Sequence, residues 1–275
     1  MNKPVVPRLS YATPEDPWLK QKLIQALEYL TGKYKIQGLY DALDEEQRQG
    51  GAFWAAALQA LDIELKYDSR QFAKIPPKGP LILIANHPFG VLDGLIICHL
   101  ATEARGSFYI LTNSVLCTAK ELEPYLLPVD FSPTKTALRT NIETKNRAVK
   151  QLKAGGTVVI FPAGEVSTSY SLFGKAHDAE WKTFTARLIH EAKANVVPVF
   201  FHGQNSRIFH WASQLHLTLR LSLLLHEVKN KMGKTIQLSI GDPITYAHLQ
   251  HLKNRHALMQ FLRHTTYGLA AEGPA

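Results

Sequence analysis

Residues 81–94, LILIANHPFGVLDG, decide the fold of this chain. The stretch opens with five apolar residues, and a short apolar run that stops at a turn is typical of a strand buried on both faces. Pro88 and Gly90 predict that turn. Apolar residues then recur at helical spacing, so a helix is expected to begin at Asp93 or Gly94.

A histidine and a carboxylate stand at the carboxyl end of this strand, where ligands bind in open α/β sheets. The neutral imidazole of His87 would accept a proton from a substrate hydroxyl, while Asp93 would fix its tautomer and stabilise the imidazolium. Alternatively, His87 caps a helix and Asp93 is an ordinary N-cap. On these residues alone the two interpretations have equal weight.

Length and charge limit the class of protein. The chain has 275 residues, 45% of them hydrophobic, which suits an α/β domain with a substantial core. Its net charge of +8 favours an anionic partner such as phospholipid headgroups, a phosphorylated substrate, an acidic carrier protein or nucleic acid. Because the basic residues are dispersed and no nucleic-acid-binding motif is present, nucleic acid is not expected.

The cellular compartment is predicted from sequence features that the chain lacks. The two cysteines lie in apolar surroundings without metal-ligand spacing, as in proteins of a reducing compartment. The amino terminus lacks the apolar core of a signal peptide, and no apolar run approaches the ~18 residues of a membrane span. Twelve histidines show no consistent spacing to carboxylates or cysteines, so no metal site is expected. We expect a cytoplasmic protein at the inner face of the cytoplasmic membrane.

The first part of the chain, residues 1–70, is predicted to be an extended proline-containing lead-in followed by a helical pair at 18–30 and 44–67. These helices are amphipathic and carry tryptophan and phenylalanine. They would either lie in a membrane interface or pack on the sheet as an ordinary helical layer. The rest, residues 71–275, is predicted to be one α/β domain.

Strands and helices alternate through this second part. Further strands are expected at 107–111, 126–131, 157–161, 196–201 and 235–240. Further helices are expected at 115–122, 141–153, 181–194, 208–225 and 248–267. Such alternation predicts a mainly parallel central sheet covered by helices on both faces.

Two of these strands end in polar turns, as the first strand does. The strand at 157–161 leads into FPAGEVS at 161–167, and the strand at 196–201 leads into HGQNSR at 202–207. The carboxyl ends of parallel strands meet at one edge of a sheet, so a shared site is expected there. Arg207 is a candidate anion-binding residue because of its position after the third strand.

Three segments resemble motifs of the glycerolipid acyltransferases, which acylate glycerol-3-phosphate and lysophospholipids. Residues 86–93 resemble the first motif, which is Asn-His, four residues and Asp. Residues 161–167 resemble the third motif, Phe-Pro-Glu-Gly-Thr-Arg-Ser, and residues 197–199 the Val-Pro-Val-like fourth. Their order and separations also agree, over residues 70–245.

Two departures from the family pattern narrow the resemblance. Five residues separate His87 from Asp93 where the family has four, and Ala163 holds the position of the motif glutamate, with Glu165 two residues later. With residues 202–207, these departures resemble a bacterial branch of hemolysin-like or lyso-ornithine-lipid-type acyltransferases. The extra residue implies a wider turn, which the glycine in that turn permits.

The resemblance implies a reaction and its participants. His87 would deprotonate the acceptor hydroxyl and Asp93 would orient the imidazole. The hydroxyl would attack an acyl thioester carried by coenzyme A or acyl carrier protein. The acceptor would be a lysolipid or a glycerol-phosphate-type molecule, the association with the membrane peripheral, and no cofactor would be bound.

The resemblance also suggests substrate-binding residues, which are Asn86, Arg139, Phe161, Pro162, Gly164, Glu165, Ser167 and Arg207. Arg139 matches the second-motif arginine that contacts phosphate, or it is one solvated charge on a helix. Glu165 and Ser167 would hydrogen-bond the acceptor headgroup, or Glu165 caps its loop. Backbone amides around residues 161–165, or a nearby cation, would stabilise the oxyanion.

Other classes of protein fit less well. A serine esterase would need a G-x-S-x-G nucleophile elbow, which the sequence lacks. A nucleotide-dependent enzyme would need a Walker lysine pattern or a G-x-G-x-x-G turn, and neither is present. The alternative left open is a catalytically degenerate protein that binds lysolipid or anionic membrane without turning lipid over.

Overall fold

The computed structural model describes most of the chain from residue 32 onward. The described residues are 17–18, 21–22, 32–113, 122–130, 132, 134–169, 171, 174–215 and 217–271. The predicted lead-in and the helices expected at 18–30 and 115–122 lie largely outside these residues.

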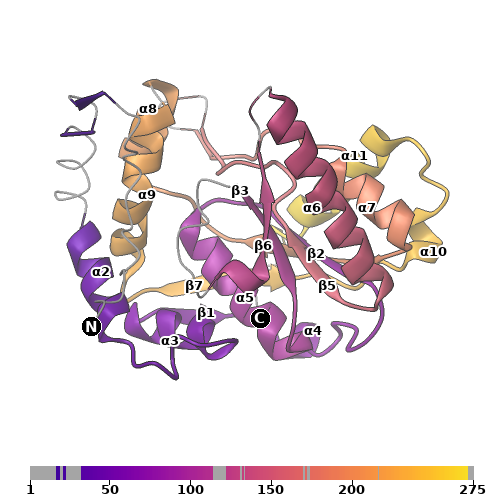
Figure 1. Ribbon diagram of the computed structural model, residues 1–275, viewed down its shortest axis with the longest axis horizontal. Coiled ribbons are helices and arrows are strands. Elements are labelled where there is room, and N and C mark those ends of the chain that lie inside the picture. The colour runs from indigo at the N-terminus through magenta and orange to yellow at the C-terminus, as the bar shows by residue number, and fades with distance from the viewer. Residues whose placement is uncertain are drawn as a thin grey trace.

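Seven strands form one sheet in the described part of the chain, in the order β1-β7-β6-β2-β5-β3-β4 (Figure 1). The strands are β1 Glu64–Lys66, β2 Leu81–Ala85, β3 Tyr109–Asn113, β4 Leu126–Val129, β5 Thr157–Ile160, β6 Asn195–Phe201 and β7 Thr235–Ile240. Neighbouring strands are parallel except for β6 and β7. The predicted mainly parallel sheet is therefore confirmed.

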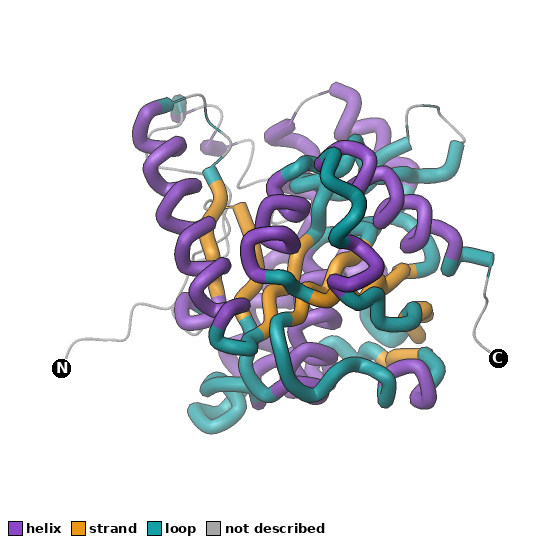
Figure 2. Tube along the Cα trace, turned by 90° about the vertical axis from the view of Figure 1, so that its right-hand side faces the viewer, coloured by secondary structure: helices purple, strands orange, loops and turns teal. Residues whose placement is uncertain are grey.

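Helices cover both faces of this sheet. They are α2 Lys33–Ala42, α3 Ala52–Ala60, α4 Ser69–Phe72, α5 Val91–Arg105, α6 Lys135–Lys153, α7 Phe184–Ala192, α8 Arg207–Leu215, α9 Leu217–Lys231, α10 Tyr246–Leu249 and α11 Arg255–Gly268, with a 3₁₀ turn at Glu123–Tyr125. Figure 1 shows α6, α7 and α11 on one side and α3, α5 and α9 on the other. Figure 2 shows the strands enclosed between these helical layers.

The central strand β2 supplies side chains to both layers of the core. Leu81, Leu83 and Ala85 belong to the apolar cluster that includes α3 and α5, whereas Ile82 and Ile84 belong to the cluster that includes α6, α7 and α11. All five are at most 1% exposed. Successive strand residues point to opposite faces, so a strand covered on both sides has to be apolar throughout.

The predicted helix at 44–67 is wrong at both ends. It begins only at Ala52, because residues 44–51 form turns. Helix α3 ends at Ala60, and Glu64–Lys66 pair with β7 as the edge strand β1. Asp62 lies between them at φ 53°, in the left-handed region that a helix cannot continue through. Strand β1 lies before residue 70, and the domain boundary placed at that residue stays a prediction.

The second predicted amphipathic helix packs on the α/β core rather than facing outward. Phe53 and Trp54 of α3 are 7% and 3% exposed. The Trp54 ring lies 5.8 Å from that of Phe108 and 5.5 Å from that of Tyr125. No helix within the described ranges combines the length and apolar character needed to cross a lipid bilayer.

Other predicted helices also have different limits. The helix expected to begin at Asp93 or Gly94 begins at Val91, and the helix expected at 181–194 is the shorter Phe184–Ala192. The helix expected at 141–153 begins earlier, because the Thr134 side chain accepts a backbone N–H of the first turn and caps α6. The segment 208–225 is not one helix but parts of α8 and α9. The terminal segment 248–267 is also divided, because Asn254 caps a new helix, α11.

The carboxyl ends of three parallel strands meet at one edge of the sheet. β2 lies between β5 and β6 and is parallel to both, with Ile84 opposite Ile160 and Ala85 opposite Val199. The segments that leave these strands, including 161–167 and 202–206, therefore lie beside the turn that follows β2.

Candidate active site

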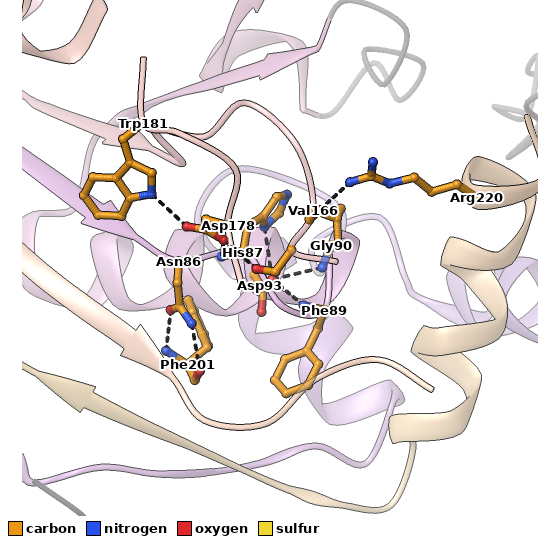
Figure 3. Close-up of polar contacts among 11 residues, drawn as sticks. Asn86, His87, Phe89, Gly90, Asp93, Val166, Asp178, Trp181, Phe201 and Arg220 are labelled. Atoms are coloured by element: carbon orange, nitrogen blue, oxygen red, sulfur yellow. Dashed lines mark hydrogen bonds and ion pairs between the residues drawn. The ribbon is translucent and has the colours of Figure 1, made fainter. Parts of the chain in front are cut away.

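A hydrogen bond joins the two residues singled out at the end of β2. His87 Nδ1 lies 3.0 Å from Asp93 Oδ2 (Figure 3). The same carboxylate oxygen accepts backbone N–H groups from Phe89 at 2.7 Å and Gly90 at 2.9 Å. The Asp93 side chain thus stabilises the segment between β2 and α5 from its own position at the start of α5. The five-residue spacing is accommodated with the imidazole and carboxylate in contact.

Gly90 makes this wider turn possible. Its backbone lies at φ 77° and ψ −115°, a conformation that side chains with a Cβ rarely adopt. A Cβ at this position would come within 2.8 Å of Leu224 and 3.2 Å of Val166. Glycine is therefore required both by the backbone conformation and by the close approach of α9 and the 161–167 segment.

The Asp93 carboxylate is fully buried. Its side chain is 0% exposed, and its second oxygen, Oδ1, is buried without a hydrogen-bond partner. Burial raises the pKa of the Asp93 carboxyl above its usual range, and the hydrogen bonds from His87, Phe89 and Gly90 oppose that shift only in part. Ionisation of this buried carboxyl is therefore costly, and the three hydrogen bonds on Oδ2 offset part of that cost.

His87 is held at several points besides Nδ1. Its backbone N–H donates to Asp178 Oδ1 at 3.1 Å, and its carbonyl oxygen accepts the Ser167 N–H at 2.8 Å. Its ring stacks on Phe161, with 3.9 Å between ring centroids. The described residues provide no hydrogen bond to Nε2, and the side chain is 16% exposed. Nε2 is therefore the ring nitrogen that a substrate hydroxyl can meet.

The segment after β5 forms a tight turn beside His87. Gly164 lies at φ 74°, and its N–H donates to the carbonyl oxygen of Phe161 at 2.9 Å. Pro162 is buried and its carbonyl oxygen accepts the Lys182 N–H. Ser167 is only 2% exposed, and its hydroxyl donates to Asp178 Oδ1.

Glu165 faces outward from this turn and pairs with an arginine from α9. Its carboxylate lies 2.9 Å from Arg220 Nη1. Arg220 Nη2 donates to the carbonyl oxygen of Val166 (Figure 3). The Arg220 side chain is 11% exposed and that of Glu165 50%. A largely buried guanidinium thus lies against the segment whose last residue, Ser167, contacts the His87 carbonyl.

A family model described as "Acyltransferase" matches residues 51–273, which include every residue of this site. The chain belongs to the acyltransferase family. Lyso-glycine lipid O-acyltransferases from Phocaeicola vulgatus and Bacteroides thetaiotaomicron are similar in sequence. They are 27% and 26% identical over 238 residues, which are 82% of this chain and 80% and 82% of theirs.

The fold of the acyltransferase is shared with a solved enzyme. The 1-acyl-sn-glycerophosphate acyltransferase PlsC from Thermotoga maritima matches with a TM-score of 0.53, over 92% of this chain and 96% of that one. The two sequences are 16% identical, so this likeness concerns the fold alone.

Not every residue predicted to bind substrate lies in the open part of the acyltransferase site. Asn86 is 4% exposed, and its side-chain amide exchanges two hydrogen bonds with the backbone of Phe201 in β6. This pair joins the ends of β2 and β6. The Asn86 side chain therefore has a structural contact, and substrate binding by it stays a prediction.

The two other predicted arginines lie on helices. Arg139 of α6 is 83% exposed in its side chain and pairs with Glu143 one turn later, as a solvated helical charge does. Arg207 is exposed at the start of α8. Among the contacts between described residues, none joins Arg139 to the dyad. Their roles in binding substrate stay predictions.

Two residues of the site were missed in the sequence. Asp178 lies in the irregular segment before α7, and Arg220 lies in the first turn of α9. Neither belongs to a recognisable motif, and both reach the site only through tertiary contacts. Among the described residues, no group of three or more His, Cys, Asp or Glu side chains is placed to hold a metal ion.

Proposed function

We propose that this acyltransferase moves a fatty acyl chain from an acyl thioester to a hydroxyl of a lysolipid, with His87 as general base and Asp93 as its partner. The main support for the proposal is the distance of 3.0 Å between His87 Nδ1 and Asp93 Oδ2. The names of the two sequence relatives support a lysolipid acceptor. A glycerol-phosphate-type acceptor is the second possibility.

The proposed proton transfers follow from the tautomer of His87. With Nδ1–H donating to Asp93, Nε2 has a free lone pair and takes the proton of the acceptor hydroxyl. The oxygen forms a bond to the thioester carbonyl carbon, giving a tetrahedral intermediate. The carbon–sulfur bond then breaks, and the imidazolium returns its proton to the leaving thiolate. The buried Asp93 carboxylate stabilises the imidazolium while it exists.

The oxyanion of the intermediate needs hydrogen-bond donors, and the turn after β5 is the proposed source. The Gly164 N–H is already used within this turn, because it donates to the carbonyl oxygen of Phe161. The backbone N–H groups of Phe161, Ala163 and Glu165 are therefore the proposed donors, because Pro162 has none. Preorganised donors of this kind are worth about 10²–10³ in kcat.

Arg220 is proposed to recognise a negatively charged acceptor headgroup. Its guanidinium is largely buried next to the 161–167 segment, and its side-chain ion-pair partner, Glu165, is half-exposed. A carboxylate or phosphate of the acceptor would replace Glu165 in this ion pair, because a guanidinium binds either group with two parallel hydrogen bonds. The headgroup would then lie beside His87 with the hydroxyl toward Nε2.

The acyl donor and the lipid surface are further parts of the proposal. A net charge of +8 suits both an acidic acyl carrier protein and the anionic inner face of the cytoplasmic membrane, and coenzyme A is also anionic. Exposed apolar side chains at Leu138 and Ile142 of α6 and Ile208 and Trp211 of α8 support peripheral association. No resident cofactor is proposed.

The test is direct acylation. Purified protein is incubated with each lysolipid and with glycerol-3-phosphate, and with labelled acyl-coenzyme A or acyl carrier protein. The lipids are then analysed by mass spectrometry. We expect one acyl chain to be added to at least one lysolipid. If no acceptor gains a chain with either donor, the proposed activity is wrong.

A further inference from the structure

A second buried carboxylate, Asp178, contacts the backbone of His87, whereas Asp93 contacts its imidazole. Asp178 is 4% exposed and accepts three hydrogen bonds. Oδ1 accepts the backbone N–H of His87 at 3.1 Å and the hydroxyl of Ser167 at 2.5 Å, and Oδ2 accepts the indole N–H of Trp181 at 2.8 Å (Figure 3). None of the acyltransferase motifs quoted above includes this residue.

Asp178 itself is fixed by the last helix of the chain. Its backbone N–H donates to the Tyr267 hydroxyl oxygen at 2.8 Å, and its carbonyl oxygen accepts Arg263 Nη2 at 3.3 Å. Burial, with the charge of Asp178 as a second cause, raises the pKa of Tyr267 to about 12. The tyrosine therefore remains neutral, and its oxygen remains an acceptor. A carboxylate anchored from α11 thus contacts the end of β2.

The contacts form a closed ring around the His87 backbone. Asp178 accepts its N–H, Ser167 donates to its carbonyl oxygen, and the Ser167 side chain donates back to Asp178. The ring therefore ties His87 to the segment after β5 that holds Phe161 and Glu165. Asp93 fixes the imidazole, whereas Asp178 and Ser167 fix the main chain from which that imidazole extends.

We propose that Asp178 is a positioning residue that sets where the His87 imidazole stands relative to the acceptor hydroxyl and the thioester. The inference rests on the proposed function of His87. A displacement of about 1 Å at a reacting group costs up to about a hundredfold in rate. The role requires that both terminal atoms of the side chain accept hydrogen bonds, since both face N–H or O–H donors.

This requirement makes Asp178→Asn an informative substitution. In one orientation the amide oxygen accepts the hydrogen bonds of His87 and Ser167, but the amide NH₂ then faces the indole N–H of Trp181. In the reverse orientation the oxygen accepts the hydrogen bond of Trp181, and the NH₂ faces the His87 N–H. Two donors oppose each other in either case, and the second orientation releases His87.

Removing the Trp181 donor should therefore restore the first orientation. The variants to compare are Asp178→Asn, Trp181→Phe and the double variant, all in the full-length chain. For Asp178→Asn we expect kcat to fall about tenfold to a hundredfold with the KM of both substrates nearly unchanged. Trp181→Phe should change kcat by less than about threefold, and the double variant should recover most of the lost kcat.

Hydrogen exchange of the peptide that contains the His87 amide gives a second readout, which is independent of turnover. It should be faster in Asp178→Asn than in wild type and slow again in the double variant. If wild type transfers no acyl chain, the proposed function fails. The exchange rate then still shows whether the Asp178 side chain holds the His87 amide. Wild-type kcat in Asp178→Asn would overturn the inference. So would an equal loss in the single and double variants, or unchanged exchange.

Discussion

Replacing Asp93 by asparagine should separate catalysis from stability. In wild type, three groups donate hydrogen bonds to one carboxylate oxygen, Oδ2, while Oδ1 has no hydrogen-bond partner among the described residues. An asparagine oxygen in the Oδ2 position can accept the same three hydrogen bonds. Asp93→Asn should therefore keep the turn and the His87 tautomer but remove the negative charge that stabilises the imidazolium.

The size of the effect follows from this charge. Two unit charges about 4 Å apart interact by about 4 kcal/mol at an effective dielectric constant of 20, which corresponds to about a thousandfold in rate. We expect kcat of Asp93→Asn to fall by roughly that factor. Asp93→Ala should lose activity and stability together. It leaves the Phe89 and Gly90 amides without an acceptor, at about 1–3 kcal/mol each.

The pH dependence has a definite sign. Because burial raises the folded-state pKa of Asp93, its contribution to stability is fully present below the ordinary aspartate pKa of about 4 and is lost as pH rises through the folded pKa. At neutral pH, Asp93→Asn should therefore melt close to or above wild type. The difference from wild type should shift in favour of wild type as pH falls toward about 4.

Two measurements check this reasoning: acyl transfer followed by mass spectrometry, and thermal unfolding across the same pH range. The reasoning is refuted if Asp93→Asn turns over like wild type. It is also refuted if Asp93→Asn is as unstable at neutral pH as Asp93→Ala, since the substituted amide would then have failed to accept the turn's hydrogen bonds.

Two further predictions concern recognition and acid stability. Arg220→Gln should raise KM for an anionic lysolipid about tenfold but leave KM for its neutral methyl ester unchanged, which kinetics with the two acceptors would show. Equal loss for both acceptors would exclude headgroup recognition by Arg220. Burial lowers the pKa of His202 and His210, so their stabilising contribution is present above the ordinary histidine pKa of about 6.5 and is lost as pH falls through the folded values. The melting temperature should therefore fall in mild acid, and less so in His210→Phe; an identical fall in both proteins would contradict this.

The central part of the fold could be predicted because its signals are local. β2 has the predicted bounds, since an apolar run that is buried on both faces stops where the polar Asn86 begins. The helix predicted at 44–67 ran too far because apolar residues continue past Ala60. The left-handed residue Asp62, which ends the helical path, carries no strong signal in the sequence. Short edge strands such as β1 depend on their partner more than on their own residues.

The site shows the same division between local and tertiary information. His87 and Asp93 lie six positions apart on either side of a turn, so the sequence alone predicted that they could meet. Asp178 and Arg220 reach the same place from an irregular segment and from α9. Their positions depend on how α9 and α11 pack, which no local pattern encodes. Ser167 was predicted from its motif, but its buried contact with Asp178 was not.

The most direct test of the account is the turnover of His87→Ala. Wild type and variant would be incubated with the same lysolipid and acyl thioester, the product measured by mass spectrometry, and folding checked by thermal unfolding. Removal of the general base should reduce kcat by at least about 10²–10⁴-fold while the fold is retained. A folded His87→Ala variant that acylates lysolipid at the wild-type rate would contradict the account.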